Sequence, residues 1–187
     1  MMPRRSDARA NALIAAERLF RIKGYAATGL AEILAASGAP KGSFYFHFPD
    51  GKAQVAREVL AAYGARGAAV MTKLAQRHAG EPDAFVAALC DAVIREMRDA
   101  DWMLGCAAHN IAAEAPAGDD GLLASAGAVF TSWVAIIARA LGGPRRESHS
   151  AALALLAAIA GARTFARTSR SAAPFEAIKR MRWGPSQ

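Results

Sequence analysis

The sequence SGAPKGSFYFHF at residues 37–48 decides how this chain is expected to fold. Residues 37–39 form a glycine-containing turn, and Pro40 suits the first turn of a helix, where its missing N–H costs no hydrogen bond. A short helix is therefore predicted over residues 41–47, and Pro49 ends it. Two short helices joined by such a turn, with an apolar helix before and a long helix after, are typical of a helix-turn-helix.

The predicted helix has one face for the protein core and one for a partner. Phe44 and Phe48 are four residues apart, so both rings point inward, where Phe20 of the preceding helix would meet them. Gly42 has no side chain and lets the helix approach the wall of a groove closely. The polar residues of the segment are left to face outward: Lys41, Ser43, Tyr45 and His47.

These outward residues suit a surface that binds duplex DNA. Lys41 can donate to guanine O6 and N7 or to a phosphate, and Ser43 and His47 can hydrogen-bond base edges or phosphates. Tyr45 carries a hydroxyl group on a rigid arm, which suits a phosphate oxygen. Lys52, at the start of the following helix, adds a cation beside a helix N-terminus.

Residues 44–48 could instead be an aromatic core segment. Three phenylalanines in five residues cannot all be buried on one helix, so Phe46 is expected to be partly exposed. A core segment also rarely begins with Lys-Gly-Ser. The residues alone favour DNA binding and leave both interpretations open.

An all-α fold is predicted from composition. Of the 187 residues 48 are alanine, the best helix former and a poor strand former, and β-branched residues are few and scattered. Helices are predicted at residues 7–23, 28–36, 41–47, 50–77, 82–98, 104–114, 119–141, 146–169 and 174–182. Gly24 ends the first helix, either Thr28 or Gly29 caps the second, and Gly64 and Gly67 are expected to weaken or bend the fourth.

The length allows a small module attached to a larger domain. We expect an N-terminal three-helix helix-turn-helix domain at residues 1–52, continuing into the helix 50–77. A C-terminal helical domain for ligand binding and dimerisation is expected at residues 53–187.

Composition also restricts the compartment. Cys90 and Cys106 are too few for a disulfide framework and fit a reducing cytoplasm. The chain has no N-terminal signal pattern, and its longest apolar run, residues 151–162, is too short to cross a bilayer. A cytoplasmic protein with no membrane partner is therefore expected.

The net charge of +7 is unevenly distributed along the chain. Residues 1–52 carry +4, residues 53–142 carry −3 and residues 143–187 carry +6. The basic N-terminal segment indicates that a polyanion meets the first 50 residues, although arginine used for solubility would give the same balance. The basic C-terminal stretch has no nucleic-acid interpretation, and few acids lie near it in the sequence.

The N-terminal motif resembles the DNA-binding domain of the TetR/AcrR family of bacterial transcriptional regulators. The resemblance rests on Gly24-Tyr25, Thr28, Ile33, residues 37–48 and Lys52, all at the family's spacing. It implies a ligand-responsive DNA-binding regulator, in most cases a repressor that a small effector releases from its operator.

Four departures from the common family pattern indicate a branch. Gly29 replaces Ser or Val, Leu34 stands where Ala is common, Pro40 replaces a capping Ser or Thr, and the loop 49–51 is one residue longer. With a looser similarity in the C-terminal half, they resemble the LmrA/YxaF-like branch. That looser similarity rests on Gly105-Cys106, Trp133, Ala162-Arg163 and residues 166–170.

Carried to this chain, the resemblance implies phosphate contacts from Thr28, Tyr45 and Lys52. It implies base or backbone contacts from five residues of the recognition helix: Lys41, Gly42, Ser43, Phe46 and His47. Arg4 and Arg5 form either a minor-groove arm or a solvated tail.

Two half-sites about 34–36 Å apart require a fixed dimer, so a pseudo-palindromic double-stranded operator and a homodimer are the expected partners. The helices 146–169 and 174–182 are the predicted interface, and the resemblance implies the same. Small and apolar residues that permit close approach, or that belong to the core, are Leu153, Leu156, Ala157, Ala160 and Thr164. Basic residues expected to skirt this interface are Arg163, Arg167, Arg170, Lys179, Arg180 and Arg182.

An effector site is predicted among the middle helices, where large apolar groups stand in an alanine-rich background. A hydrophobic or aromatic small molecule would suit its lining. The candidate residues, each of which could equally be core, are Phe85, Leu89, Met97, Trp102, Met103, Cys106, His109, Asn110, Phe130, Trp133 and Phe165.

Catalysis, a cofactor and a metal site are not expected. The sequence has no glycine-rich phosphate loop, no nucleophile elbow and no convincing metal-ligand spacing. Two other functions stay open: an all-α small-molecule binding protein without sequence-specific DNA binding, and a protein that coats DNA non-specifically.

Overall fold

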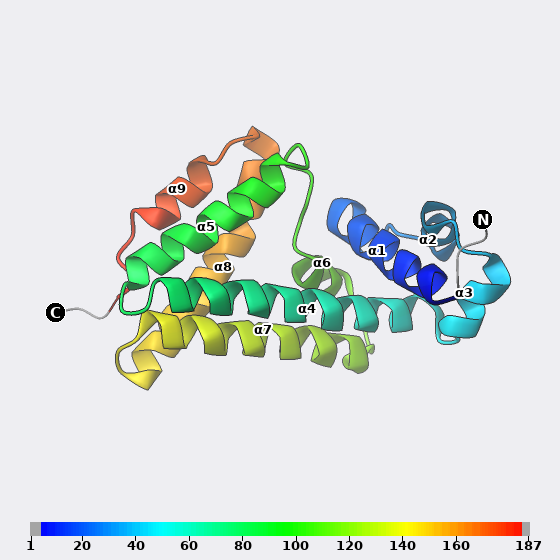
Figure 1. The fold of residues 1–187 in the computed structure, drawn as a ribbon, viewed down its shortest axis with the longest axis horizontal. Helices are drawn as coiled ribbons and strands as arrows, with labels where there is room; N and C mark the ends of the chain where they lie inside the picture. The colour runs from blue at the N-terminus through cyan, green and yellow to red at the C-terminus, as the bar shows by residue number, and fades with distance from the viewer. Residues whose placement is uncertain (1–4, 185–187) are drawn as a thin grey trace. The chain divides into compact units, whose positions relative to one another are not determined.

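The computed structural model describes residues 5–184, with side chains from residue 8 onward. The described residues form nine α-helices and no strand, which confirms the all-α class (Figure 1). The helices are α1 (Arg5–Lys23), α2 (Leu30–Ser37), α3 (Lys41–His47), α4 (Gly51–Arg77), α5 (Pro82–Arg98), α6 (Ala107–Glu114), α7 (Asp120–Leu141), α8 (Arg145–Ser169) and α9 (Ala173–Lys179).

Most helix ends lie within two residues of their predicted positions. The largest differences are at α6, which begins at Ala107 rather than 104, and at α9, which ends at Lys179 rather than 182. Cys106 has an extended backbone and is the N-cap of α6, and residues 103–106 are not helical. The N-cap of α2 is Gly29 and not Thr28.

The described residues divide into two compact units. The first unit holds the described residues up to Gly64 together with Cys106–Val129, and the second holds Ala65–Gly105 and the described residues from Phe130 onward. The expected division at residues 52 and 53 is not the one that the packing follows. α6 packs against α1, so it belongs with the N-terminal helices.

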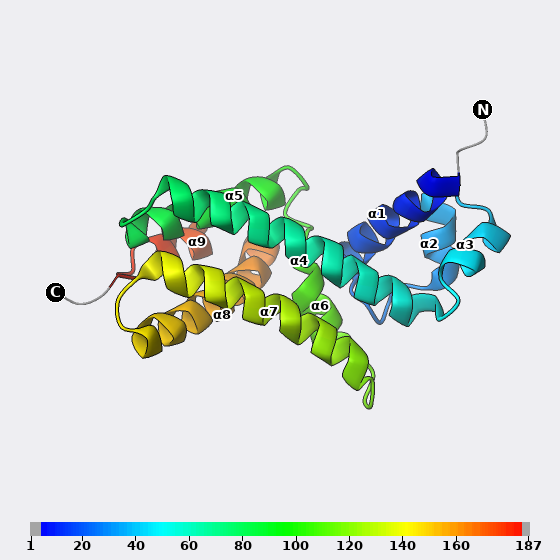
Figure 2. The same ribbon diagram turned by 60° about the horizontal axis from the view of Figure 1, so that its bottom comes forward.

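The core of the first unit is made of aromatic and branched side chains. α1 packs against α2, α3 and α6, and the three N-terminal helices gather beside the start of α4 (Figure 2). Fully buried residues of this core are Phe20, Ile33, Phe44, Phe48, Val55, Leu60, Ile111 and Leu122.

The core of the second unit is built around α9, which packs against α5 and α8. The indole N–H of Trp183 donates to the carbonyl oxygen of Ile178 at 3.0 Å, and the Trp183 backbone N–H donates to Asp83 at 2.8 Å. The first bond holds the chain after α9 against α9 itself, and the second fastens it to α5. Deeply buried residues of this unit are Phe85, Val86, Met97, Ile137, Leu141, Leu155 and Phe175.

Gly64 and Gly67 do not interrupt α4, which is continuous over 27 residues. A Cβ atom at Gly64 would lie 2.7 Å from Val129 Cγ2, and one at Gly67 would lie 2.7 Å from Trp133 Cζ2. The expected interruption of α4 at these glycines is therefore absent among the described residues. The two glycines let α4 and α7 approach closely.

α7 and α8 are each long and apolar enough to cross a membrane by length and composition alone. The sequence excluded a membrane span on the length of its longest uninterrupted apolar run. That test was therefore too narrow. Each helix buries one side in the protein, with Trp133 and Ile137 on α7 and Leu155 and Ile159 on α8. Such burial is typical of core helices, which pass the same composition test.

Candidate nucleic-acid interface

The recognition helix α3 is held by its aromatic side chains. Phe44 and Phe48 are buried with ring centroids 5.0 Å apart, as their four-residue spacing predicts. Phe20 of α1 is also buried, and its ring lies 5.4 Å from that of Tyr25. A helix of seven residues is not stable alone, so this packing fixes its position.

The turn before α3 has the expected geometry. Gly38 has φ +64°, a left-handed conformation that favours glycine. The hydroxyl of Ser37 donates to the Leu34 carbonyl at 3.1 Å and accepts the Ala39 N–H at 3.2 Å. Pro40 is the N-cap of α3, which begins at Lys41 as predicted, and its carbonyl accepts the Phe44 N–H at 3.1 Å.

The outward face of α3 carries the predicted DNA-binding residues. Lys41 and Gly42 are exposed, Ser43 is half-buried, and the Tyr45 and Phe46 side chains are 43% and 75% exposed. A Cβ atom at Gly42 would meet nothing within 4 Å, so packing inside the chain does not require glycine there. That absence of internal constraint agrees with a need for close approach to something outside.

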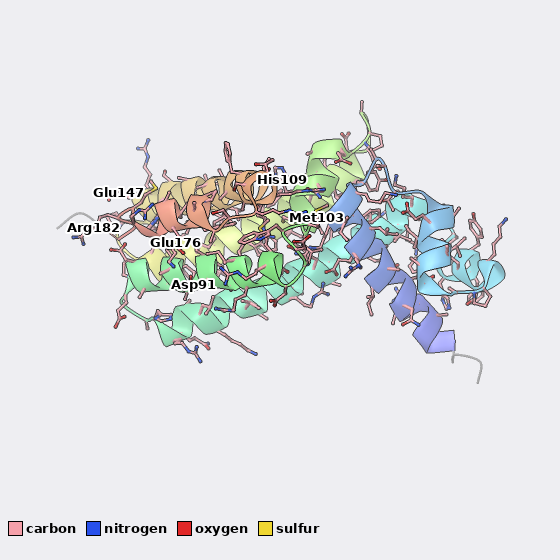
Figure 3. The ribbon with its side chains drawn as sticks, turned by 90° about the horizontal axis from the view of Figure 1, so that it is seen from above. Asp91, Met103, His109, Glu147, Glu176 and Arg182 are labelled. Carbon is pink, nitrogen blue, oxygen red and sulfur yellow. The ribbon has the colours of Figure 1, made fainter. Side chains whose placement is uncertain are left out.

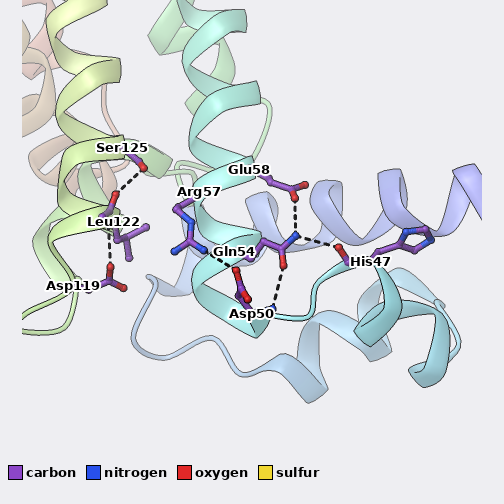
Figure 4. A network of polar contacts seen from close by, with 9 residues as sticks. His47, Asp50, Gln54, Arg57, Glu58, Asp119, Leu122 and Ser125 are labelled. Carbon is purple, nitrogen blue, oxygen red and sulfur yellow. Dashed lines mark hydrogen bonds and ion pairs between the residues drawn. The ribbon is translucent and has the colours of Figure 1, made fainter.

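Gln54 brackets the end of α3, a role that the sequence analysis missed (Figure 4). Its side-chain amide donates to the His47 carbonyl and to Glu58 Oε1, both at 3.1 Å, and its carbonyl oxygen accepts the Asp50 N–H at 3.2 Å. A capping-box search examines the third residue of a helix, here Ala53, and so overlooks Gln54 one position later.

Arg9 of α1 also contacts the region where α3 ends and α4 begins. Its guanidinium bonds to Glu58 at 2.6 Å and lies 5.8 Å above the centroid of the Phe48 ring. The contact ties α1 to α4 and covers the ring on which α3 rests. The side chain of Arg5, and all of Arg4, lie outside the described residues, so the proposed arm stays a prediction.

Three predicted DNA contacts are placed differently from the expectation. Thr28 is fully buried and donates its hydroxyl to the Gly24 carbonyl at 2.7 Å, so it cannot reach a phosphate in this conformation. His47 is half-buried, and its Nε2 atom is buried with no partner among the described residues. Lys52 donates to the Ala26 carbonyl at 3.3 Å and lies 4.2 Å from the Tyr25 ring centroid. Burial lowers the pKa of Lys52 below its ordinary value, while the charge of Glu114 acts in the opposite sense.

α6 supplies two side chains to the N-terminal helices. The Asn110 amide, a candidate effector contact, donates instead to the Phe20 carbonyl at 2.9 Å and the Arg21 carbonyl at 3.4 Å. Glu114 accepts the Ala26 N–H at 2.7 Å. A Cβ atom at Gly24 would overlap the Glu114 carboxylate, so glycine there serves the close approach as well as the positive φ of +92°.

Half of the ten remaining effector candidates are buried in the second unit. Phe85, Leu89, Met97, Trp102 and Trp133 are buried. Half-buried or partly accessible candidates are Met103, Cys106 and Phe130. His109, labelled in Figure 3, is exposed, and Phe165 is 68% exposed on α8, so neither belongs to a buried lining.

The loop after α5 is strained beside these candidates. Asp101 and Trp102 have φ values of +50° and +63°, which residues other than glycine rarely adopt. The Trp102 N–H donates to the Met97 carbonyl at 2.6 Å, and the Arg98 guanidinium lies 5.9 Å from its ring. Strain of this kind gathers at ligand sites and switch segments.

Four basic residues of the C-terminal stretch pair with acids, most of them distant in sequence. Lys179 bonds to Asp91 of α5 at 2.8 Å and to Glu176 at 3.1 Å; the two acids are labelled in Figure 3. Further pairs are Arg163–Glu96, Arg170–Asp101 and Arg182–Asp83. The hydrogen bonds to Asp91 and Glu176 raise the pKa of Lys179 above its ordinary value. The expected shortage of acids was wrong because most of them come from α5 and its following loop.

The chain is similar to known regulators along both units. Residues 12–59 match the model for bacterial regulatory proteins of the tetR family, and residues 82–181 match that for the C-terminal domain of LmrA/YxaF-like transcriptional regulators. The chain is 56% identical over 54 residues, 29% of each chain, to the HTH-type transcriptional regulator LmrA of Bacillus subtilis. It is 31% identical over 140 residues to YxaF, an HTH-type transcriptional regulator of the same species, covering 75% of this chain and 73% of YxaF. The solved structure of the regulatory protein TetR from Rhodobacter sphaeroides has a TM-score of 0.83 at 23% identity and covers 92% of this chain and 95% of that one.

Proposed function

This chain belongs to the TetR family of bacterial transcriptional regulators, in its LmrA/YxaF-like branch, and from that premise we propose how it works. It is a DNA-binding regulator. We propose that it is a homodimeric repressor whose α3 helices enter successive major grooves of a pseudo-palindromic operator. A small hydrophobic or aromatic effector, bound in the second unit, releases it.

The observation that carries the DNA-binding role is the division of α3 into two faces. Phe44 and Phe48 are buried, while Lys41 and Tyr45 are exposed. A rigid backing of this kind holds donors in place for base edges and phosphates before DNA arrives. Lys52 can join these contacts by exchanging the Ala26 carbonyl for a phosphate oxygen, whereas Thr28 acts through the turn that it fastens.

Selection of bound duplexes from a random library, followed by gel-shift titration of the selected site, tests this role. Lys41→Ala is expected to weaken binding at least about tenfold and to reduce the salt slope by about one per protomer. Lys73→Ala, an exposed lysine on α4, is the matched control and should change affinity less than about twofold. Wild-type protein that selects no sequence would favour a small-molecule binding protein or a non-specific DNA-coating protein instead.

An apolar surface on α8 supports the homodimer. Leu153 is 51% and Phe165 is 68% exposed, and Ala157 and Thr164 on the same helix are also exposed. Small residues between two large apolar ones permit close helix approach. Phe175 and Ile178 of α9 are buried within the unit, so we assign the apolar part of the dimer contact to α8.

The effector response is proposed to pass through α6. The strained loop that holds Trp102 leads directly into this helix, whose Asn110 and Glu114 bond to the backbone of α1 and of the α1–α2 turn. An effector that prefers one loop conformation would then bias the position of α1 relative to α3. A coupling of about 1–3 kcal/mol would lower operator affinity about 5- to 150-fold.

A panel of apolar aromatic compounds, added to the gel-shift titration, tests the response. Compounds that release DNA should lose their effect in Met97→Ala, because this side chain is buried at the end of α5, just before the strained loop. They should keep their effect in His109→Ala, whose side chain is exposed. Release that is unchanged in Met97→Ala would move the effector site elsewhere. An unchanged DNA affinity of both variants without compound is the necessary control.

A further inference from the structure

Phe46 stands apart from the other aromatic residues of α3 because its side chain is 75% exposed. Its neighbours Phe44 and Phe48 are buried, and Tyr45, which is 43% exposed, ends in a polar hydroxyl. Phe46 thus places an apolar ring, without any hydrogen-bonding atom, on the face that carries Lys41 and Gly42. Single exposed apolar residues are common on protein surfaces, so the contacts that hold this ring distinguish it from an ordinary surface residue.

The Phe46 ring is backed by a chain of aromatic contacts. It meets the His47 ring edge-on at 5.3 Å and 77°, and His47 meets the Phe48 ring at 6.4 Å and 65°. Phe48 is buried against Phe44. Gln54 donates to the His47 carbonyl and so fixes the backbone beside the ring. These contacts restrict the conformations of Phe46 before DNA binds.

His47 packs against the Phe46 ring and is poorly placed to donate a hydrogen bond to DNA through Nε2. Its Nε2 atom is buried and has no partner among the described residues, although burial of a polar atom normally requires one. A histidine aimed at a base edge would leave that nitrogen accessible. The packing of the His47 ring between Phe46 and Phe48 therefore explains its position better than a direct Nε2 contact does.

The chemistry of the ring limits what it can recognise. It cannot bond to a phosphate, nor to the donors and acceptors of base edges. The apolar group that the major groove presents to proteins is the 5-methyl of thymine, which phenylalanine contacts favourably. We infer that Phe46 is a specificity-determining residue that selects thymine through this methyl group. The inference rests on the proposed entry of α3 into the major groove.

The test uses the wild-type chain and DNA that differs by one methyl group. In the site selected above, each thymine is replaced in turn by deoxyuridine, which removes only the 5-methyl. One thymine per half-site should lose about fourfold in affinity, the contribution of one methyl group, and about fifteenfold when both half-sites are changed. In Phe46→Ala the thymine and uracil sites should bind equally.

Two further arms separate the possible outcomes. A cytosine placed at that position should bind weakly, and 5-methylcytosine there should recover affinity for wild type but not for Phe46→Ala. Tyr45→Phe, which removes a hydroxyl from the neighbouring position, should weaken all sites equally and keep the uracil effect. Deoxyuridine that has no effect at any position, while Phe46→Ala still weakens binding, would overturn the inference and favour insertion of the ring between bases. Failure of wild type to select any site would overturn the proposed function instead.

Discussion

α3 and α8 both expose side chains on the surface of the protein, but the two helices are held in place in different ways. α3 has seven residues, and its position depends on Phe44, Phe48 and the bracket from Gln54. α8 has 25 residues and buries a full side between Ala152 and Ala166. The exposed surface of α3 carries one cation, Lys41, beside Tyr45 and Phe46, and that of α8 is apolar around Phe165.

The difference teaches which properties can be changed separately. A short helix depends on its buried side, so a change there removes both fold and function. A long helix keeps its fold when its outer surface changes, so a change there alters assembly alone. The exposed residues also indicate different partners, because cations require a polyanion while an apolar stripe requires an apolar surface.

The largest effect is expected where α3 is buried. Phe44→Ala should lower the free energy of unfolding by about 3–5 kcal/mol, because it removes a buried ring and leaves a cavity. Phe46→Ala, two residues away and 75% exposed, should change it by less than about 0.5 kcal/mol. Chemical denaturation of both variants measures the difference. Equal losses would mean that the two faces of α3 are not distinct.

The next effect concerns the surface of α8. Leu153→Glu with Phe165→Glu should give a folded monomer and weaken operator binding about a hundredfold, because the two half-sites are no longer bound together. Leu123→Glu on α7, a leucine of similar exposure at 44%, is the control and should stay dimeric. Sedimentation velocity and circular dichroism measure assembly and fold. A dimer that persists in the double variant would remove α8 from the proposed interface.

Features that depend on near neighbours in the sequence could be predicted, and features that depend on distant ones could not. The bounds of α3 and the burial of Phe44 and Phe48 follow from spacing within twelve residues. Glu114 is 88 residues from the Ala26 N–H that it accepts, and no sequence pattern joins them. Arg163 likewise finds its acid, Glu96, at a distance of 67 residues.

The placement of Phe165 has a different origin, because residue type was used without position. Phe165 was assigned to a buried lining as a large apolar residue, but it lies on the side of α8 that faces away from the core. The phosphate contact that the resemblance implies for Thr28 stays a prediction, although in this conformation its hydroxyl donates to the Gly24 carbonyl four residues earlier. Helical phase would have placed Phe165 beside exposed Gly161 and Thr168.

A smaller effect is expected at the contact between α6 and the α1–α2 turn. Glu114→Gln keeps the shape of the side chain but removes the charge from its bond to the Ala26 N–H, at a cost of about 1–2 kcal/mol. DNA affinity should fall severalfold at most, since Lys41 and Tyr45 are untouched. Glu81→Gln, an exposed residue of the second unit, is the control. Thermal unfolding that is the same in both variants would show that the Glu114 bond contributes nothing.

The smallest functional effect, but a clear chemical one, separates the two cysteines. Burial raises the pKa of Cys90 to about 12, so its reactive thiolate is about a thousandfold rarer at neutral pH than for a thiol of ordinary pKa. Cys106, at the N-cap of α6, is partly accessible. A thiol reagent should label one cysteine in the folded protein and two after denaturation, with Cys106→Ala removing the fast reaction and Cys90→Ala keeping it.

The raised pKa of Cys90 also means that the unfolded chain loses this proton first, so stability should fall as pH rises above about 8.5. Cys90→Ala should reduce that slope, and rapid labelling of Cys90 in the folded protein would show that α5 is not packed as described.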